Sequence, residues 1–276
     1  MLATLIIVFR EVIEAGLIVG IVLAATKGVP RRGVFVSYGI VAGIVGACLV
    51  AAFAGEISAL FEGSGQELFN ASVLLLAVVM LIWHNAWMAG HGRAMAQEMR
   101  QIGASVAAGK KSLAALAVVC GVAVLREGSE VVLFLYGIAA SGGASAPGMV
   151  VGGALGILAG ASMSLVMYLG LLSIPLRHLF AVTSGLIILL AAGLAAQAIA
   201  FLQQAGYFEL GTTTLWDSSW LLSEDSLLGR LLHTLVGYTD RPDGAELAVY
   251  LLTILVMIGL MRLVQSRGAA TKPAVG

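Results

Sequence analysis

The sequence predicts an all-α membrane protein with seven transmembrane helices, arranged as a 3+3 inverted repeat plus one extra helix. Three observations support this fold class. First, 60% of the 276 residues are hydrophobic and only 11% are charged, with a mean hydropathy of +1.01, well above the values typical of soluble domains. Second, the apolar residues fall into long stretches. Third, a short charged motif occurs twice, in the first and the fourth stretch.

Seven stretches are long enough to cross a bilayer, which requires roughly 20 predominantly apolar residues. They cover residues 3–26, 34–54, 68–88, 112–140, 148–173, 178–202 and 246–264. The first stretch has no basic residue before it and contains Arg10, Glu11 and Glu14. A cleavable signal peptide has the opposite pattern, so we expect this stretch to remain as a helix.

The basic residues predict the orientation, because short loops rich in Lys and Arg stay in the cytoplasm. Basic residues follow the first, third, fifth and seventh stretches: Lys27, Arg31 and Arg32, then Arg93, Arg100, Lys110 and Lys111, then Arg177, then Arg262, Arg267 and Lys272. The other loops are acidic or uncharged. We therefore expect the N-terminus outside and the C-terminus in the cytoplasm. The formal net charge of zero gives no indication of a nucleic-acid partner.

The charged motif is Arg-Glu-x-x-Glu, and its two copies predict the internal symmetry. Residues 10–14 read Arg-Glu-Val-Ile-Glu and residues 126–130 read Arg-Glu-Gly-Ser-Glu, 116 positions later. The first and fourth helices run in opposite directions, so equivalent helices imply an inverted repeat. Within a single membrane domain, 1–276, we expect one three-helix repeat at 1–111 and the inverted one at 112–202. An extracytoplasmic loop then covers 203–245, and the seventh helix and cytoplasmic tail cover 246–276.

Both motifs lie near the bilayer midplane, because a helix rises 1.5 Å per residue. An unpaired charge at a helix centre costs about 2.5 to 3.5 kcal/mol, so the six charges are expected to face the bundle interior. Spacings of three and four residues put each Arg and both its Glu on one side of their helix. We predict a shared site of four carboxylates, with two arginines supporting them: Glu11, Glu14, Glu127 and Glu130, with Arg10 and Arg126.

The predicted site favours a cation. Four glutamates and two arginines leave a formal charge of minus two, and carboxylate oxygens suit Mg, Ca, Mn and ferric iron and accept ferrous iron. The residues alone indicate a hard divalent or trivalent cation. The alternative is a structural Arg-Glu network that fixes the register of the helices.

The motifs resemble those of a known family, the oxidase-dependent high-affinity iron permeases of fungi and their bacterial relatives. The match is residue by residue at the six motif positions, and segments 87–93, 215–220, 235–238 and 241–242 also look similar. This resemblance implies seven spans in a bacterial cytoplasmic membrane and transport of Fe(II) or Fe(III) as substrate, with no cofactor. It also implies an extracytoplasmic partner that oxidises or delivers iron.

Other residues are candidates for ligands along the path. His84, Met88 and His91 lie around the inner end of the third stretch and are candidate exit ligands, although Trp83 and Trp87 beside them also fit an interfacial aromatic belt. Asp217 in the outer loop is a candidate entry ligand. In the same loop, Ser223 begins a predicted helix with an apolar stripe formed by Leu227, Leu228, Leu231, Leu232 and Leu235.

Two other functions remain open on the residues. A membrane di-iron carboxylate oxidase would also gather glutamates on facing helices, but such bundles add Glu-x-x-His on two helices, and this chain has no Glu followed by His at that spacing. We therefore expect a transporter and no enzyme. A transporter of another divalent cation is the remaining alternative.

Overall fold

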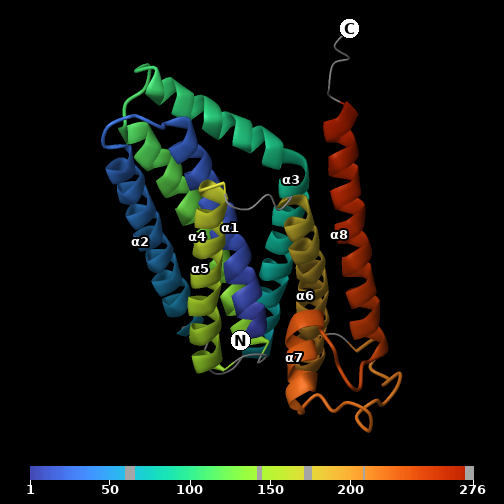
Figure 1. Cartoon of the computed structure of the whole chain (residues 1–276). Helices are drawn as coiled ribbons and strands as arrows, with labels where there is room; N and C mark the ends of the chain where they lie inside the picture. Colours follow the sequence, from blue (N-terminus) through green and yellow to red (C-terminus); the bar gives the residue numbers. More distant parts are fainter. Residues whose placement is uncertain (60–65, 142–144, 171–175, 208, 271–276) are drawn as a thin grey trace.

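In the computed structural model the protein is built from α-helices. The structure describes residues 1–59, 66–141, 145–170, 176–207 and 209–270. Within these ranges there are eight helices and no strand, only an isolated bridge between Thr214 and Asp243. The helices are α1 Leu2–Ala25, α2 Arg32–Ala59, α3 Gln66–Ala107, α4 Ala114–Ala140, α5 Ala146–Tyr168, α6 Leu176–Gln204, α7 Leu227–Val236 and α8 Gly244–Ala270. The long helices lie side by side in one bundle, and α7 caps one end of it (Figure 1).

Five of these helices combine the length and the composition of a membrane span. They are α2, α3, α5, α6 and α8, each with an apolar stretch of 23 to 27 residues and a mean hydropathy of 1.8 to 2.4. Large apolar side chains on α2, α5 and α8 are exposed, which fits a lipid environment. The chain is therefore a multi-pass membrane protein. Helices α1 and α4, with 24 and 27 residues, are also long enough to cross a membrane, but each contains an Arg and two Glu.

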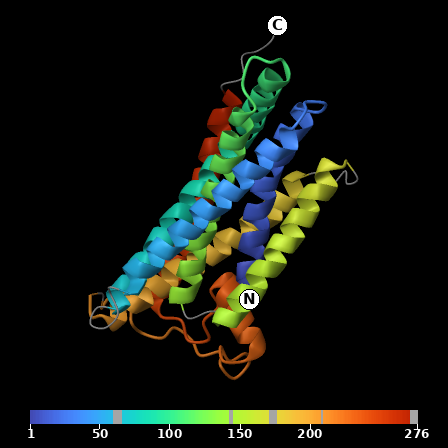
Figure 2. The same ribbon diagram turned by 90° about the vertical axis from the view of Figure 1, so that its left-hand side faces the viewer.

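Helices of one predicted repeat pack mainly against helices of the other. The most extensive contacts join α1 to α5 and α2 to α4, and each pair lies side by side in both ribbon views (Figures 1 and 2). Helices α1 and α4 contact each other, run in opposite directions (Figure 1), and both contact α3. Helices α3 and α6 also pack together, and α8 covers them from one side. The charged helices α1 and α4 consequently occupy the middle of the bundle.

Glycines bring the exchanged helices close together. A Cβ at Gly43 of α2 would lie 2.7 Å from the carbonyl oxygen of Gly121 in α4, and a Cβ at Gly156 of α5 would lie 2.8 Å from that of Leu5 in α1. Any larger residue would push the backbones apart. The two contacted positions, Leu5 and Gly121, are 116 residues apart, the interval that separates the two charged motifs.

Apolar clusters lie on both sides of the charged motifs. Towards the end at which α7 lies, Ile7, Leu81 and Phe134 belong to a cluster that joins α1, α3, α4, α6 and α8. Towards the other end, Val22 and Cys120 belong to a second cluster with residues of α2 and α3. The charges in between are therefore enclosed by packed side chains along the bundle axis.

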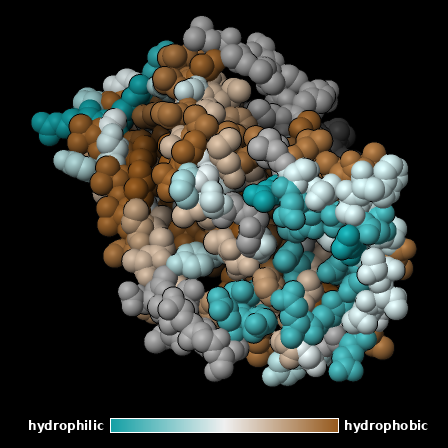
Figure 3. Space-filling model, turned by 90° about the horizontal axis from the view of Figure 1, so that it is seen from below, coloured by the Kyte–Doolittle hydropathy of each residue, from teal (hydrophilic) through white to brown (hydrophobic). Residues whose placement is uncertain are grey.

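The segment between α6 and α8 exposes both polar and apolar side chains. Seen from the end of the bundle at which α7 lies, hydrophilic side chains gather on one part of the surface beside apolar faces (Figure 3), and residues 209–217 are exposed. The predicted helix is present as α7, but it begins at Leu227 instead of Ser223. Ser226 caps it by accepting a hydrogen bond from the Gly229 amide at 3.0 Å, which leaves Ser223 in a preceding turn.

Candidate metal site

The α1 copy of the motif is fully enclosed. Arg10, Glu11 and Glu14 are all buried, and Arg10 is only 2% exposed. Its Nη1 atom lies 3.2 Å from Oε1 of Glu11, and its Nη2 atom lies 2.9 Å from Oε1 of Glu14. Nη2 also donates a hydrogen bond to Oδ1 of Asn85 on α3 at 3.5 Å. The helical spacing of four residues directs Glu14 back to the arginine, so this copy neutralises much of its own charge.

The α4 copy has the same spacing but is more open. The Nε atom of Arg126 lies 3.2 Å from Oε1 of Glu130 and 3.9 Å from Oε1 of Glu127. Both glutamates are buried, whereas the Arg126 side chain is 34% exposed. Its guanidinium carbon lies 4.5 Å from the centre of the Trp87 ring. An aromatic ring on α3 therefore takes the place that the Asn85 amide has beside Arg10.

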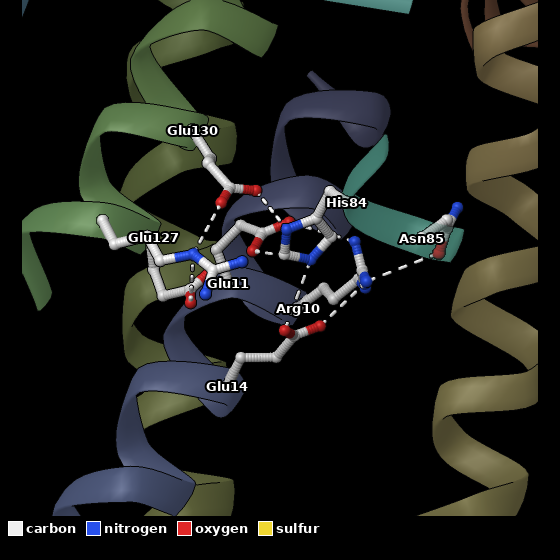
Figure 4. A network of polar contacts seen from close by, with 8 residues as sticks. Arg10, Glu11, Glu14, His84, Asn85, Glu127 and Glu130 are labelled. Atoms are coloured by element: carbon white, nitrogen blue, oxygen red, sulfur yellow. Dashed lines mark hydrogen bonds and ion pairs between the residues drawn. The ribbon is translucent and has the colours of Figure 1, made fainter. Parts of the chain in front are cut away.

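His84 of α3 joins the two copies, as Figure 4 shows. Its Nε2 atom lies 3.4 Å from Oε2 of Glu14 and 4.0 Å from Oε2 of Glu11, and its Nδ1 atom contacts Oε2 of Glu130. The ring is buried. Glutamates from α1 and α4 thus surround one imidazole from α3, and each nitrogen faces a different motif.

Four donor groups come close enough to hold one metal ion. One ligand atom from each of Glu11, His84, Glu127 and Glu130 lies within 4.8 Å of the others, and all four residues are buried. In the described part of the chain, Oε2 of Glu11 and of Glu127 has no hydrogen-bond partner. A buried carboxylate oxygen without a donor is costly. Carboxylates with one imidazole form a ligand set that suits divalent iron, manganese and zinc.

The structure therefore brings together all six predicted motif residues. Of the other candidates, only His84 lies at the site. His84 lies among the carboxylates and not at the inner end of α3, because α3 continues to Ala107. Met88 is half-buried and His91 is exposed, one and two turns further along. Asp217 is exposed in the segment between α6 and α8, where Arg241 pairs with it at 3.0 Å.

Two partners of the site were not expected from the sequence. Asn85 contacts Arg10 and Trp87 contacts Arg126, so α3 supports both arginines. A signal for Asn85 was present, because it forms an adjacent polar pair with His84 within an otherwise apolar stretch. Trp87 gave no such signal, since an aromatic residue near a helix end also fits the membrane interface.

Comparison with known proteins places the chain in a family. A family model described as the iron permease FTR1 family matches residues 1–271. The chain is similar to the protein named ferrous iron permease EfeU from Escherichia coli O6:K15:H31, with 29% identity over 279 residues and complete coverage of both chains. The EfeU proteins of Escherichia coli O157:H7 and Yersinia pestis are 31% and 30% identical to it, over 94% and 92% of this chain and 96% and 91% of theirs.

No solved structure matches the chain. The family model and the relatives nevertheless cover nearly all of it, including both charged motifs and α3. The names of the family and of the relatives are those of permeases, which are transporters and not enzymes. We conclude that the chain belongs to the iron permease FTR1 family and is a transporter.

Proposed function

We propose that this protein moves Fe(II) across the membrane through a site formed by Glu11, His84, Glu127 and Glu130. The observation that carries the proposal is the cluster of four buried donor atoms within 4.8 Å, contributed by three helices. The choice of Fe(II) over Fe(III) has two supports: the relatives are named ferrous iron permeases, and an imidazole among carboxylates is a ligand that Fe(II) accepts readily.

Glu14 has a related role in this proposal. Its Oε1 atom is paired with Arg10 at 2.9 Å and its Oε2 atom lies 3.4 Å from His84. We assign it to orienting these two groups, while the predicted set of four glutamates still supplies the negative charge of the site. Arg10 and Arg126 neutralise part of that charge. Two negative charges remain when the imidazole is neutral, and a divalent cation would balance them.

We further propose that α1 and α4 are spans, which brings the total to seven and makes α1–α3 and α4–α6 an inverted repeat. Five of the six motif charges are buried inside the bundle, so α1 and α4 can lie in lipid without exposing them. The positions on α1 and α4 that the glycines of α5 and α2 contact, Leu5 and Gly121, are separated by the 116-residue interval of the motifs. In addition, α1 begins and α8 ends at opposite ends of the bundle (Figure 1), in keeping with an odd number of spans. The basic loops favour an external N-terminus in a bacterial cytoplasmic membrane.

The proposal is tested by radio-iron uptake into proteoliposomes that contain the purified protein. We expect uptake with Fe(II) kept reduced under anaerobic conditions and little uptake with Fe(III) held in a soluble chelate. Uptake of Mn(II) is measured in parallel to test whether another divalent cation is the cargo. Stronger uptake of Mn(II) than of Fe(II) would mean that iron is the wrong cargo. Oxygen consumption measured on Fe(II) addition tests the di-iron oxidase alternative. Uptake that is equal in empty and protein-containing liposomes would reject the transport proposal.

A further inference from the structure

The guanidinium group of Arg126 has two kinds of partner, carboxylates and an aromatic ring. Carboxylate oxygens of Glu130 and Glu127 lie 3.2 and 3.9 Å from its Nε atom. The Trp87 ring also faces this group, with its centre 4.5 Å from the guanidinium carbon. A cation over the face of an indole is attracted by the ring quadrupole, and tryptophan is the strongest of the aromatic side chains in this respect.

The ring of Trp87 is itself held in place. The His91 ring is stacked on it, with centres 5.2 Å apart and planes at 9°, and Nδ1 of His91 lies 3.1 Å from the Trp87 carbonyl oxygen. Trp83, one turn earlier on the same helix, differs clearly, because its side chain is 68% exposed. Of these two tryptophans on α3, only Trp87 is turned towards the site.

We propose that Trp87 is a positioning residue for iron binding, which holds Arg126 at the edge of the site while iron takes over its carboxylates. This inference rests on the proposed function of the site. An ion that binds Glu127 and Glu130 competes with Arg126 for the same oxygen atoms. The ring offers the guanidinium an attraction that uses no carboxylate, so the arginine keeps a partner when it gives up Glu130.

Arg126 is suited to this movement and Arg10 is not. The Arg126 side chain is one-third exposed, so a shift of its guanidinium displaces little packed structure. Arg10 is enclosed by Glu11, Glu14 and Asn85, with 2% of its surface exposed. The α4 copy is therefore the side of the site at which the countercharge yields, and Trp87 is the residue that sets this difference.

The test compares uptake kinetics of three variants in proteoliposomes. Trp87→Leu removes the ring face, Trp87→Phe retains a weaker one, and Trp83→Leu is the matched control on the same helix. We expect Trp87→Leu to raise the KM for Fe(II) about threefold to tenfold with little change in maximal rate. Trp87→Phe should fall between it and the unchanged protein, and Trp83→Leu should match the unchanged protein. Equal KM values for Trp87→Leu and Trp83→Leu would overturn the inference.

A second measurement does not depend on transport. In a chain whose only tryptophan is Trp87, with Phe at positions 83, 216 and 220, the emission spectrum without metal should shift when Arg126 is changed to Gln. An unchanged spectrum would mean that the guanidinium is not at the ring, and it would reject the inference even if uptake is normal. Conversely, a shifted spectrum together with a complete absence of Fe(II) uptake would reject the proposed function and leave the contact itself established.

Trp87→Leu could also act by disturbing the helix, and Arg126→Gln resolves this as well. Without the guanidinium, the ring has nothing to position, so adding Trp87→Leu to Arg126→Gln should leave Fe(II) affinity within about twofold of that of Arg126→Gln alone. Equilibrium binding of radio-iron to the purified protein supplies the affinities. A further loss of the same size as in the unchanged background would show that Trp87 acts independently of Arg126.

Discussion

The two Arg-Glu-x-x-Glu motifs have the same charged residues at the same spacing, yet the protein surrounds them differently. On α1, Arg10 is buried and bound by two carboxylates and an amide. On α4, Arg126 is partly exposed, binds mainly Glu130 and lies over an indole ring. The difference comes from α3, which supplies both neighbours. A duplicated motif therefore does not produce two equivalent half-sites, because the third helix contacts each copy with different side chains.

Helices α3 and α6, which are counterparts in the proposed repeat, also contribute unequally to the site. Leu74 and Leu81 of α3 are buried, as are Ile187 and Leu194 of α6, 113 residues further along. At this interval the residue of α6 that corresponds to His84 is Gln197. Gln197 lines a pocket together with His233 and Glu246. Only one of the two helices therefore provides the central imidazole.

The largest effect is expected from removing a ligand charge in either motif. Glu11→Gln on α1 and Glu130→Gln on α4 keep the side-chain volume but lose the charge, and each should lower Fe(II) uptake by about a hundredfold or more. Uptake is measured in proteoliposomes with matched protein content. Retention of normal uptake by both variants would favour a purely structural Arg-Glu network.

A smaller but still large effect should separate α3 from α6. His84→Ala should weaken Fe(II) binding by about tenfold to a hundredfold, as for other single ligands or their close partners. Gln197→Ala, at the corresponding position of α6, should change it by less than about twofold. Equilibrium binding of radio-iron distinguishes the two. Similar losses in both variants would mean that α6 contributes to the site as much as α3 does.

Replacing the two arginines by lysine should destabilise the folded protein to different extents, although the charge is kept in both cases. Lysine keeps the charge but lacks the planar fork that holds two carboxylates. Arg10→Lys should therefore destabilise the folded protein by about 2 to 3 kcal/mol, because it leaves buried groups without partners. Arg126→Lys should cost less than about 1 kcal/mol, since its side chain is partly exposed. Thermal unfolding in detergent measures both. The inverse order would contradict the described difference in burial.

The smallest effect concerns an ion pair in the segment between α6 and α8, which contains neither motif. His233 Nδ1 lies 3.0 Å from Glu224 Oε1. This hydrogen bond raises the pKa of His233 and lowers the pKa of Glu224. The contribution of His233 is complete below its ordinary pKa and disappears as pH rises through the raised one. The contribution of Glu224 disappears as pH falls through its lowered pKa.

Proteolysis of the segment between α6 and α8 should therefore accelerate at alkaline pH and again at strongly acidic pH, by an amount that corresponds to less than about 1 kcal/mol. His233→Gln should remove the alkaline change and leave the KM for Fe(II) at neutral pH unaltered. A rate of cleavage that does not depend on pH in the unchanged protein would show that this pair does not hold the segment.

The positions of the charged residues of α1 and α4 were predictable, because lipid does not accommodate their charges. The charges of α1 and α4 were assigned to the bundle interior because facing lipid is too costly, and all six residues lie together in the structure. The position of His84 was not predictable in the same way. The apolar stretch predicts a span that ends at residue 88 and so places His84 near its end, but α3 continues to Ala107. Which side chains of α3 meet the arginines depends on helix rotation, which an apolar stretch does not specify.

The start of α7 shows the same limit on a smaller scale. Ser223 and Ser226 are both suitable caps, three residues apart. The structure uses Ser226, whose hydroxyl accepts from the amide of Gly229. The number of spans, the repeat and the orientation remain predictions, although the exchanged contacts of α1 with α5 and of α2 with α4 support the repeat.

These exchanged contacts have a consequence for how the protein is made. When the ribosome has released only α1, α2 and α3, the glycine face of α2 still lacks α4, and α1 still lacks α4 and α5. The nascent first half must wait in the bilayer with its α1 charges paired only with one another and with Asn85 and His84 of α3, until α4 and α5 are inserted. Assembly is therefore a single late event, and a chain that ends after α3 should be recognised as incomplete and degraded by membrane proteases.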